Sequence, residues 1–362
     1  MVFVPELMRF ADGAPVRNAE DMRKRRTELL KILQEYAYGE MPAAVPVTGR
    51  ITDKITKCCS GDAVRYNTEI TCKTANGDFT FPLSLFIPNG EGKKPLIIVI
   101  NFRPSPYDEY IPVEEITDNG FALAQIYYED ITADNEDFTS GIAKFFPQEN
   151  DRAPAKISLW AWGISRALDY LLSLDLFRED AVGVIGHSRL GKTALWCGAN
   201  DERIRFVCSN CSGCMGAAYA RSYHEGGEPL ASIAKVFPFW FCKAFQAHCA
   251  DASGLPFDQH LLAACIAPRF VLVNSASGDL WADPVSEQNT CIGASPAWQA
   301  YGFTGYQGDP APYGENEGCL DGGIAYYKRS GIHYLGRKDW NRFMKFMRER
   351  IDGTVPGTNK GE

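Results

Sequence analysis

The stretch VGVIGHSRLGKTALW, from Val182 to Trp196, constrains the fold of this 362-residue chain more than any other segment. It begins with an apolar run typical of a buried parallel strand. It then turns sharply at residues 186–189 and continues as a helix. Proteins that alternate strands and helices place polar residues at such turns for chemistry. The segment therefore predicts an α/β fold whose site includes this turn.

The turn fits a nucleophile elbow, which would expose the hydroxyl of Ser188 above the sheet. Gly186 and Gly191 would let the strand and the helix pack closely. The usual G-x-S-x-G motif has a second glycine two residues after the serine, and this chain has Leu190 there. The alternative to a nucleophile elbow is a purely structural turn between the strand and the helix.

The same residues also match the phosphate-loop pattern G-x-x-x-x-G-K-[ST]. In that interpretation Lys192 would contact phosphates and Thr193 would hold Mg²⁺. However, nucleotide-binding proteins of this type usually carry the loop after their first strand, and two expected core strands, Pro95–Asn101 and Phe121–Tyr128, come earlier here. The remaining chain therefore favours the elbow, with a nucleotide-binding protein as the less favoured alternative.

An acid and a base follow the elbow in the order of the α/β-hydrolases, which is Ser, then Asp or Glu, then His. Asp279 and Asp283 both follow an expected strand at Arg269–Asn274, and Asp279 is preferred because it is nearer to the strand end. His333 follows later, before a terminal helix. A serine needs such a base to attack at neutral pH, and the base needs a carboxylate to fix its tautomer.

The other four histidines fit the role of the base less well. His187 adjoins the serine and is expected to point away from it. The remaining three, which precede the Arg269–Asn274 strand, are His224, His248 and His260. His333 is therefore the predicted base.

Two features could stabilise an oxyanion. The backbone N–H of Arg189 follows the nucleophile, and its guanidinium could add positive charge there; an ordinary surface salt bridge is the alternative. The loop Phe102–Tyr110 follows an early strand, and such a loop supplies the second N–H in the α/β-hydrolase plan.

The pattern along the chain predicts one domain over residues 1–362, with an N-terminal extension at 1–90 and a catalytic core at 91–350. The expected fold is an α/β-hydrolase, a three-layer α/β/α sandwich with a mostly parallel sheet and an antiparallel N-terminal edge. The expected N-terminal elements are a helix at Ala19–Tyr36 and strands at Gly49–Ile55, Ala63–Cys72 and Phe79–Ile87. The other expected elements are an acidic surface loop at Glu129–Thr139, helices at Ile157–Leu174, Ala217–Tyr223, 253–266 and Trp340–Arg350, an aromatic lid or pocket wall at Lys235–Cys249, and a long segment crossing the site at 285–325.

Charge and cysteine content limit the partners. The net charge of −8 argues against nucleic acid or an anionic membrane as the main partner. Cys211-x-x-Cys214 is the single C-x-x-C pair among 12 cysteines, and without two further matched ligands it predicts no zinc site. We expect no metal, no cofactor, buried free thiols and a monomer. No signal peptide or membrane-spanning run is visible, which indicates a cytoplasmic protein, or a secreted one if a signal peptide was removed.

Several segments together resemble the glucuronoyl esterases, a carbohydrate esterase family with the α/β-hydrolase fold. The resemblance covers about Pro95 to Phe346 and, more weakly, LLKILQEYAYGEMP near the N-terminus. The segments that carry it are WAWGISRALDYL, VGVIGHSRLGKTALW, SNCSGCMGAA, FPFWF, DLWADP and GIHYLGRKDW. The G-x-S-R-x-G-K elbow is the most specific of them and accounts for Leu190 and for the phosphate-loop match.

The resemblance implies hydrolysis of esters on the carboxyl group of glucuronic acid or 4-O-methyl-glucuronic acid, as in links between xylan and lignin. It implies Ser188 as nucleophile, His333 as base and Arg189 as oxyanion aid. It also implies a sugar site in which Lys192 bonds hydroxyls, Trp281 forms a wall and Glu228, in GGEPL, binds the sugar.

The chain departs from the family pattern at Cys211, where many members carry the acid of the triad. A thiol does not replace a carboxylate without deprotonation, so Asp279 becomes the predicted acid. Three alternatives remain beside a glucuronoyl esterase: a carbohydrate acetyl esterase with the same triad, the nucleotide-binding protein, and a carbohydrate-binding relic that has lost catalysis.

Overall fold

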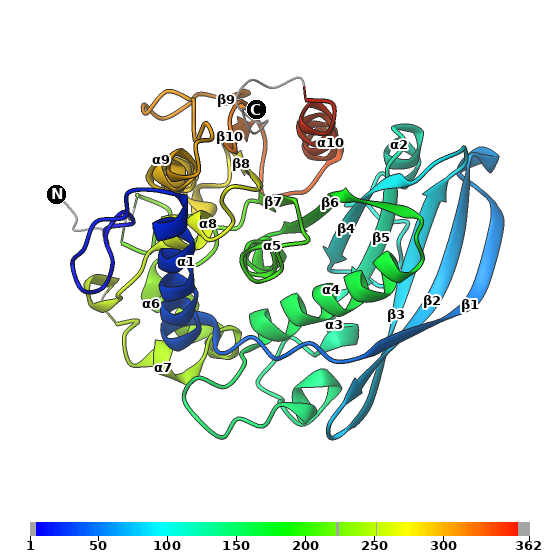
Figure 1. Ribbon diagram of the computed structural model, residues 1–362, viewed down its shortest axis with the longest axis horizontal. Coiled ribbons are helices and arrows are strands. Elements are labelled where there is room, and N and C mark those ends of the chain that lie inside the picture. The colour runs from blue at the N-terminus through cyan, green and yellow to red at the C-terminus, as the bar shows by residue number, and fades with distance from the viewer. Residues whose placement is uncertain (1–4, 222–223, 251, 354–362) are drawn as a thin grey trace.

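The computed structural model describes residues 5–221, 224–250 and 252–353. At its centre lies one 10-stranded sheet with the strand order β1-β2-β3-β5-β4-β6-β7-β8-β10-β9 (Figure 1). The strands are β1 (Val47–Cys58), β2 (Ala63–Thr74), β3 (Gly77–Pro88), β4 (Lys94–Asn101), β5 (Ala122–Tyr127), β6 (Phe177–His187), β7 (Phe206–Asn210), β8 (Phe270–Ala276), β9 (Glu317–Cys319) and β10 (Ile324–Arg329).

The central strands from β5 to β10 are parallel, whereas β1, β2 and β3 pair antiparallel at one edge and β9 pairs antiparallel at the other. The predicted mostly parallel sheet with an antiparallel N-terminal edge is therefore confirmed. The extension and the core share this sheet through the antiparallel β3–β5 pair.

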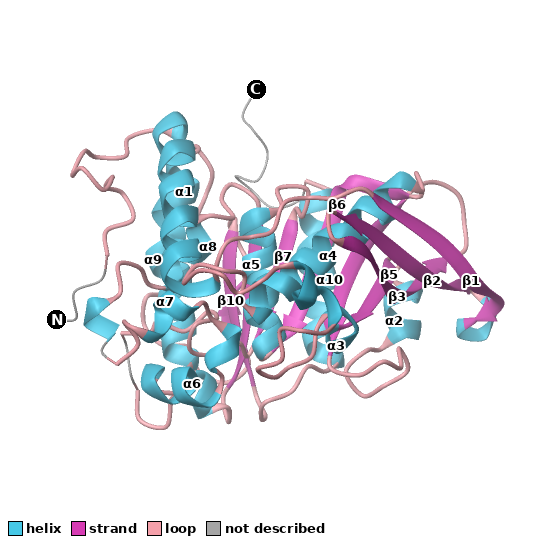
Figure 2. Ribbon diagram, turned by 90° about the horizontal axis from the view of Figure 1, so that it is seen from below, coloured by secondary structure: helices cyan, strands magenta, loops and turns pink. Residues whose placement is uncertain are grey.

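Helices cover both faces of the sheet, which gives the predicted three layers (Figures 1 and 2). Helices α2 and α10 pack on one face, and α1, α4, α5, α8 and α9 contribute to the larger core on the other. The helices are α1 (Ala19–Leu33), α2 (Val113–Asp118), α3 (Tyr128–Ile131), α4 (Lys156–Ser173), α5 (Arg189–Asn200), α6 (Leu230–Val236), α7 (Lys243–Gln246), α8 (Gln259–Ala264), α9 (Pro284–Ala300) and α10 (Arg337–Ile351). In the described residues, none of them is long and apolar enough to cross a membrane.

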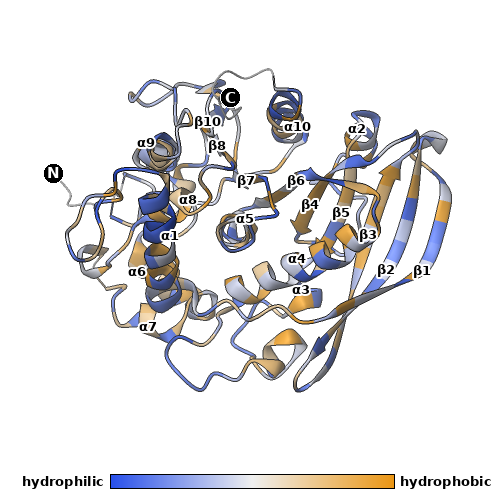
Figure 3. Ribbon diagram, in the orientation of Figure 1, coloured by the Kyte–Doolittle hydropathy of each residue, from blue (hydrophilic) through white to orange (hydrophobic). Residues whose placement is uncertain are grey.

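The two cores follow from side-chain alternation along the central strands. Ile98 on β4 belongs to the larger core, and its neighbours Ile97 and Val99 belong to the core under α10, because successive side chains point to opposite faces. Strands buried on both faces are therefore nearly continuously apolar, and Figure 3 shows hydrophobic residues along β4 and β5.

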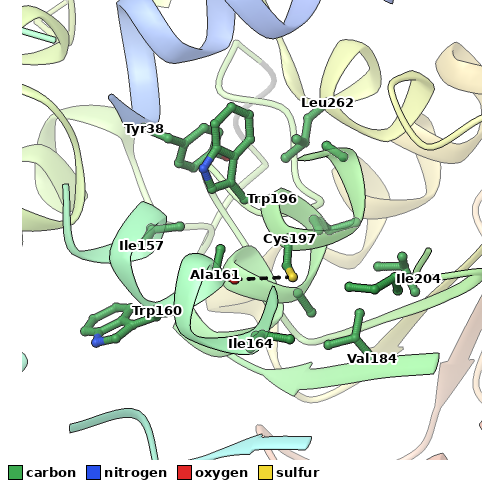
Figure 4. Close-up of a cluster of buried hydrophobic side chains, with 14 of the residues drawn as sticks. Tyr38, Ile157, Trp160, Ala161, Ile164, Val184, Trp196, Cys197, Ile204 and Leu262 are labelled. Atoms are coloured by element: carbon green, nitrogen blue, oxygen red, sulfur yellow. Dashed lines mark hydrogen bonds between the residues drawn. The ribbon is translucent and has the colours of Figure 1, made fainter. Parts of the chain in front are cut away.

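Helix α5 is held firmly in the larger core. The ring of Trp196 stacks on Tyr38 with centroids 4.6 Å apart, and the Cys197 thiol donates to the carbonyl of Ala161 on α4 at 3.5 Å (Figure 4). A rigid α5 matters for function because its first residue follows the elbow serine.

The chain reverses its direction across the sheet between β4 and β6. Strand β5 lies on one side of β4, and the next strand in sequence, β6, lies on the other. Open α/β sheets bind ligands at the carboxyl ends of strands beside such a switch point. The loops after β4 and β6 are therefore the expected borders of a site.

Three predicted segments are wrong. Residues 285–325 begin with helix α9, whose buried positions include Ser286, Cys291 and Ala294, so small and polar residues conceal the apolar stripe that marks a helix. Residues 217–221 form turns and not a helix, and Ala218 bridges to Cys214 instead; residues 222 and 223 lie outside the described part. The helix expected at 253–266 is limited to α8, which begins after its N-cap Asp258.

Candidate active site

Ser188 lies at a strained turn between β6 and α5. Its backbone has φ 56° and ψ −128°, a conformation that residues other than glycine rarely adopt and that is concentrated at functional sites. A Cβ on Gly186 would lie 2.0 Å from the carbonyl oxygen of Leu190, so this position requires glycine. Leu190 itself is fully buried in the larger core, which shows that the elbow closes without a glycine there.

The geometry of the turn does not favour a phosphate loop. The ammonium of Lys192 donates to the carbonyls of Ser212 and Cys214, and the hydroxyl of Thr193 donates to the carbonyl of Arg189. The N–H groups of Gly191 and Lys192 donate back to the Ser188 carbonyl at 2.8 and 3.3 Å. Because these donors already have partners within the fold, they are not arranged as a cradle for phosphate.

His333 and Asp279 form a close pair although they are 54 residues apart. Nδ1 of His333 lies 2.6 Å from Oδ2 of Asp279. The Asp279 side chain is 4% exposed, whereas that of His333 is 43% exposed. A buried carboxylate on Nδ1 fixes the imidazole tautomer and leaves Nε2 free to accept a proton.

The alternative acid, Asp283, has a different role. Its carboxylate accepts from the backbone N–H of Ser286 at 3.1 Å and so caps α9. It also pairs with Nδ1 of His224 at 2.9 Å. Asp283 is therefore engaged at the start of a helix, while Asp279 holds His333.

The ring of His187, the residue before the elbow serine, lies against the ring of the predicted base His333. The centroids of His187 and His333 are 4.3 Å apart, and Nδ1 of His187 lies 2.7 Å from Oδ1 of Asn210. Burial lowers the pKa of His187 to about 3, so this ring stays neutral at physiological pH. A neutral ring does not repel a positive charge on His333.

One cavity of about 300 Å³ brings together every site residue predicted from the sequence. Its wall includes Ser188, Arg189, Lys192, Glu228, Asp279, Trp281 and His333. The wall also includes Phe237 and Trp240 from the aromatic segment, which was interpreted as a lid or pocket wall. The cavity is large enough for one sugar-sized ligand with polar groups on several sides.

The cavity is lined by two opposite charges, on the buried Lys192 and the partly buried Glu228. Burial lowers the pKa of Lys192 and raises that of Glu228, while the attraction between the two opposes both shifts. The backbone N–H of Glu228 donates to the carbonyl of Trp281 at 2.9 Å, which ties its loop to the segment after β8. The Trp281 ring is half-exposed at the rim.

Arg189 is held by a residue that the sequence did not indicate. Its guanidinium pairs with Asp134, whose side chain is 7% exposed. Asp134 also accepts from the indole N–H of Trp240 at 2.7 Å and from the hydroxyl of Tyr128 at 3.2 Å. The segment 129–139 is therefore not just an acidic surface loop. Nothing in its run of acids distinguishes Asp134, because the partners come from distant segments.

The arginine also lies against a stacked pair of aromatic rings, Phe237 and Trp240. Its guanidinium carbon lies 4.7 Å from the ring centre of Trp240 and 5.3 Å from that of Phe237. Such cation–π contacts fix the plane of a guanidinium more firmly than an exposed salt bridge does. The interpretation of Arg189 as an ordinary surface pair is therefore wrong.

Glu287 is a second residue that the sequence did not indicate. Its carboxylate lies fully buried on α9 and accepts from the backbone N–H groups of Ser212 and Gly213 at 2.8 and 3.0 Å. Burial raises its pKa to about 8. This contact holds the loop after β7 whose carbonyls bind Lys192. The signal that could have revealed Glu287 is that it is the single charged residue between Pro284 and Ala300.

Comparisons with known proteins agree on one family. The family model described as glucuronyl esterase, fungi, matches residues 70–302. A carbohydrate esterase named MZ0003, from an unknown prokaryotic organism, is 30% identical over 97% of this chain and 90% of its own length. The 4-O-methyl-glucuronoyl methylesterase of Phanerochaete carnosa is 28% identical over 83% of this chain and 72% of its own length. A solved glucuronoyl esterase from Solibacter usitatus is 30% identical, with a TM-score of 0.87 over 96% of this chain and 98% of that one.

Proposed function

The chain belongs to the glucuronyl esterase family, and from this we propose that it hydrolyses esters on the carboxyl group of glucuronic acid or 4-O-methyl-glucuronic acid. The protein is a carboxylic ester hydrolase. We infer that its natural substrates are the glucuronate esters of xylan side chains. All the proposed catalytic groups come from one chain, so a monomer is sufficient for the reaction.

One observation carries the proposal. The cavity joins a nucleophile at a strained elbow, a bonded histidine–aspartate pair, and the oppositely charged side chains of Lys192 and Glu228. The first two features support an acyl transfer, and the third offers donors and acceptors to the hydroxyls of a sugar ring. The Asp279–His333 bond also argues against a relic without catalysis, because the acid that Cys211 cannot supply is present.

In the proposed mechanism, Nε2 of His333 takes the proton of Ser188 as its oxygen attacks the ester carbon. The carbonyl oxygen becomes an oxyanion, which accepts from the backbone N–H of Arg189. This N–H lies in the first turn of α5, where N–H groups have no acceptor within the helix. The fixed guanidinium adds positive charge on the same side.

Collapse of this intermediate expels the alcohol, and His333 returns the proton to the leaving oxygen. The glucuronoyl group is then esterified to Ser188. Water, deprotonated by His333, attacks the acyl carbon and releases glucuronate, and Ser188 regains its proton. Asp279 stabilises the imidazolium in both halves of the cycle without being protonated itself.

A panel of substrates tests the function. We expect the wild-type protein to hydrolyse benzyl glucuronate and to release little acetate from an acetylated xylo-oligosaccharide. Acid release would be followed by titration, and both products by chromatography. Acetate release alone would change the assignment to a carbohydrate acetyl esterase, and no turnover of either ester would contradict esterase function altogether.

Asp134 is expected to act as a positioning residue for Arg189. Asp134→Asn keeps the size of the side chain and removes the charge that orients the guanidinium. We expect kcat for benzyl glucuronate to fall about 10- to 100-fold, less than the loss of a direct oxyanion donor, with a smaller change in KM.

The matched control is Asp137→Asn, which removes an acid of the same segment that bonds Thr139 and Ser140. Asp137 is not one of the residues that line the cavity. Its replacement should therefore leave kcat within about twofold of the wild-type value and change stability little. Equal effects of the two substitutions on kcat would argue against the positioning role. The same conclusion would follow if a lower melting temperature accounted for all the activity that Asp134→Asn loses.

A further inference from the structure

The thiol of Cys211 lies beside the proposed acid and base. A sulfur, a carboxylate oxygen and an imidazole nitrogen, one each from Cys211, Asp279 and His333, all lie within 4.8 Å of one another. We propose that these three side chains form a binding site for a thiophilic divalent cation such as Zn²⁺, and that occupation of this site inhibits the enzyme.

The spacing is close to that of a zinc site. Ligand atoms that bind one tetrahedral zinc at 2.0–2.3 Å lie about 3.5 Å apart. Shifts of about an ångström would therefore close the cluster around the ion, and His333 is its most exposed member. Three protein ligands leave the fourth position to water or to a substrate oxygen from the cavity.

The ligand types select the cation. Thiolate and imidazole favour Zn²⁺ and related soft or borderline ions, whereas Mg²⁺ and Ca²⁺ prefer sites made of oxygen atoms alone. The C-x-x-C pair did not predict this site, because Cys214 is not one of its ligands and the other two come from segments that are distant in sequence.

Cys211 is held in place for this role by its backbone. Its φ of 46° is unusual for a residue with a side chain, and its N–H donates to the carbonyl of Asn274 at 2.7 Å. Within the described part of the chain, its sulfur has no hydrogen-bond partner. Burial raises the pKa of the thiol, so the sulfur carries its proton until a cation displaces it to solvent.

Binding would stop catalysis because the cation uses the same groups. It replaces the hydrogen bond between Asp279 and His333 and makes the imidazole a metal ligand, so His333 no longer accepts a proton from Ser188. This consequence rests on the proposed function, whereas the binding itself does not.

Inhibition by zinc chloride tests the functional consequence, with each variant compared with its own metal-free rate. We expect the wild type to be inhibited reversibly, with EDTA restoring the rate and with magnesium chloride having no effect. Cys211→Ala or Cys211→Ser should raise the half-inhibitory zinc concentration at least about tenfold. Cys214→Ala removes a neighbouring buried thiol outside the cluster and should leave the half-inhibitory zinc concentration unchanged.

Cadmium binding, followed by the ultraviolet absorbance of the cadmium–thiolate bond, tests the site without any esterase assay. The signal should appear in the wild type and in Ser188→Ala and be absent from Cys211→Ala. Equal zinc inhibition of wild type and Cys211→Ala, or a cadmium signal that survives Cys211→Ala, would overturn the site. A cadmium signal in a protein without glucuronate esterase activity would support the site and contradict only the proposed function.

Discussion

Replacing Ser188 with alanine is expected to lower kcat for benzyl glucuronate by about 10⁴- to 10⁶-fold, which is the usual cost of removing a serine nucleophile. KM should change little, because Lys192, Glu228 and Trp281 remain in the wall of the cavity. The folded state should keep its stability, since alanine loses a hydroxyl and no packing.

An active-site phosphonate provides a direct measurement of the nucleophile. Mass spectrometry should find the phosphonate on the wild-type peptide that contains Ser188 and no label in Ser188→Ala. Ser84→Ala is the matched control, because Ser84 lies on β3 and its hydroxyl donates to Asn67. Substantial activity in a Ser188→Ala preparation free of wild-type enzyme would exclude the acyl-enzyme mechanism.

The fold and the elbow could be predicted because local physics decides both. Strand β4 from Leu96 to Ile100 and the second half of β6, from Ala181 to Ile185, are buried on two faces, so these stretches are apolar and readily recognised. Gly186 is required by a contact with Leu190, four residues away, so the glycine and the serine appear together in the sequence. Asp279 could be placed because it follows an expected strand, and His333 because it comes late in the chain, before a terminal helix, as in the α/β-hydrolase order. The strand β10 before His333 was not predicted.

The residues that could not be predicted depend on contacts between distant segments. Asp134 bonds Arg189 and Trp240, which are 55 and 106 residues away, and no local pattern distinguishes it from the other acids of its segment. Helix α9 escaped prediction for a related reason. Its buried positions are mostly small or polar, and one of them, Glu287, holds the loop after β7. The sequence of α9 therefore lacks the apolar periodicity that identifies a helix.

The choice between Asp279 and Asp283 shows the same limit. Both follow β8 within a few residues, and the sequence preferred Asp279 only for its nearness to the strand. In the structure the turn at Leu280–Ala282 separates the two carboxylates. Asp279 then faces His333, and Asp283 faces the first turn of α9.

Asp279→Asn is expected to lower kcat by about 10⁴-fold with little effect on KM. An asparagine keeps the size of the side chain, but its amide can donate to Nδ1 of His333. The imidazole would then carry its proton on Nε2 and could not accept one from Ser188. The imidazolium formed during attack would also lose the carboxylate that stabilises it at 2.6 Å.

Asp283→Asn is the control, because it removes another carboxylate of the same segment that does not bond His333. We expect it to cost at most about 1 kcal/mol of stability, because asparagine also caps helices and only the negative charge at the start of α9 is lost, and to change kcat far less than Asp279→Asn does. Steady-state kinetics and thermal melting of both variants would give the comparison. The opposite outcome, a large loss of kcat in Asp283→Asn and an active Asp279→Asn, would show that Asp283 is the acid of the triad. Such a result would contradict the structure, in which His333 bonds Asp279.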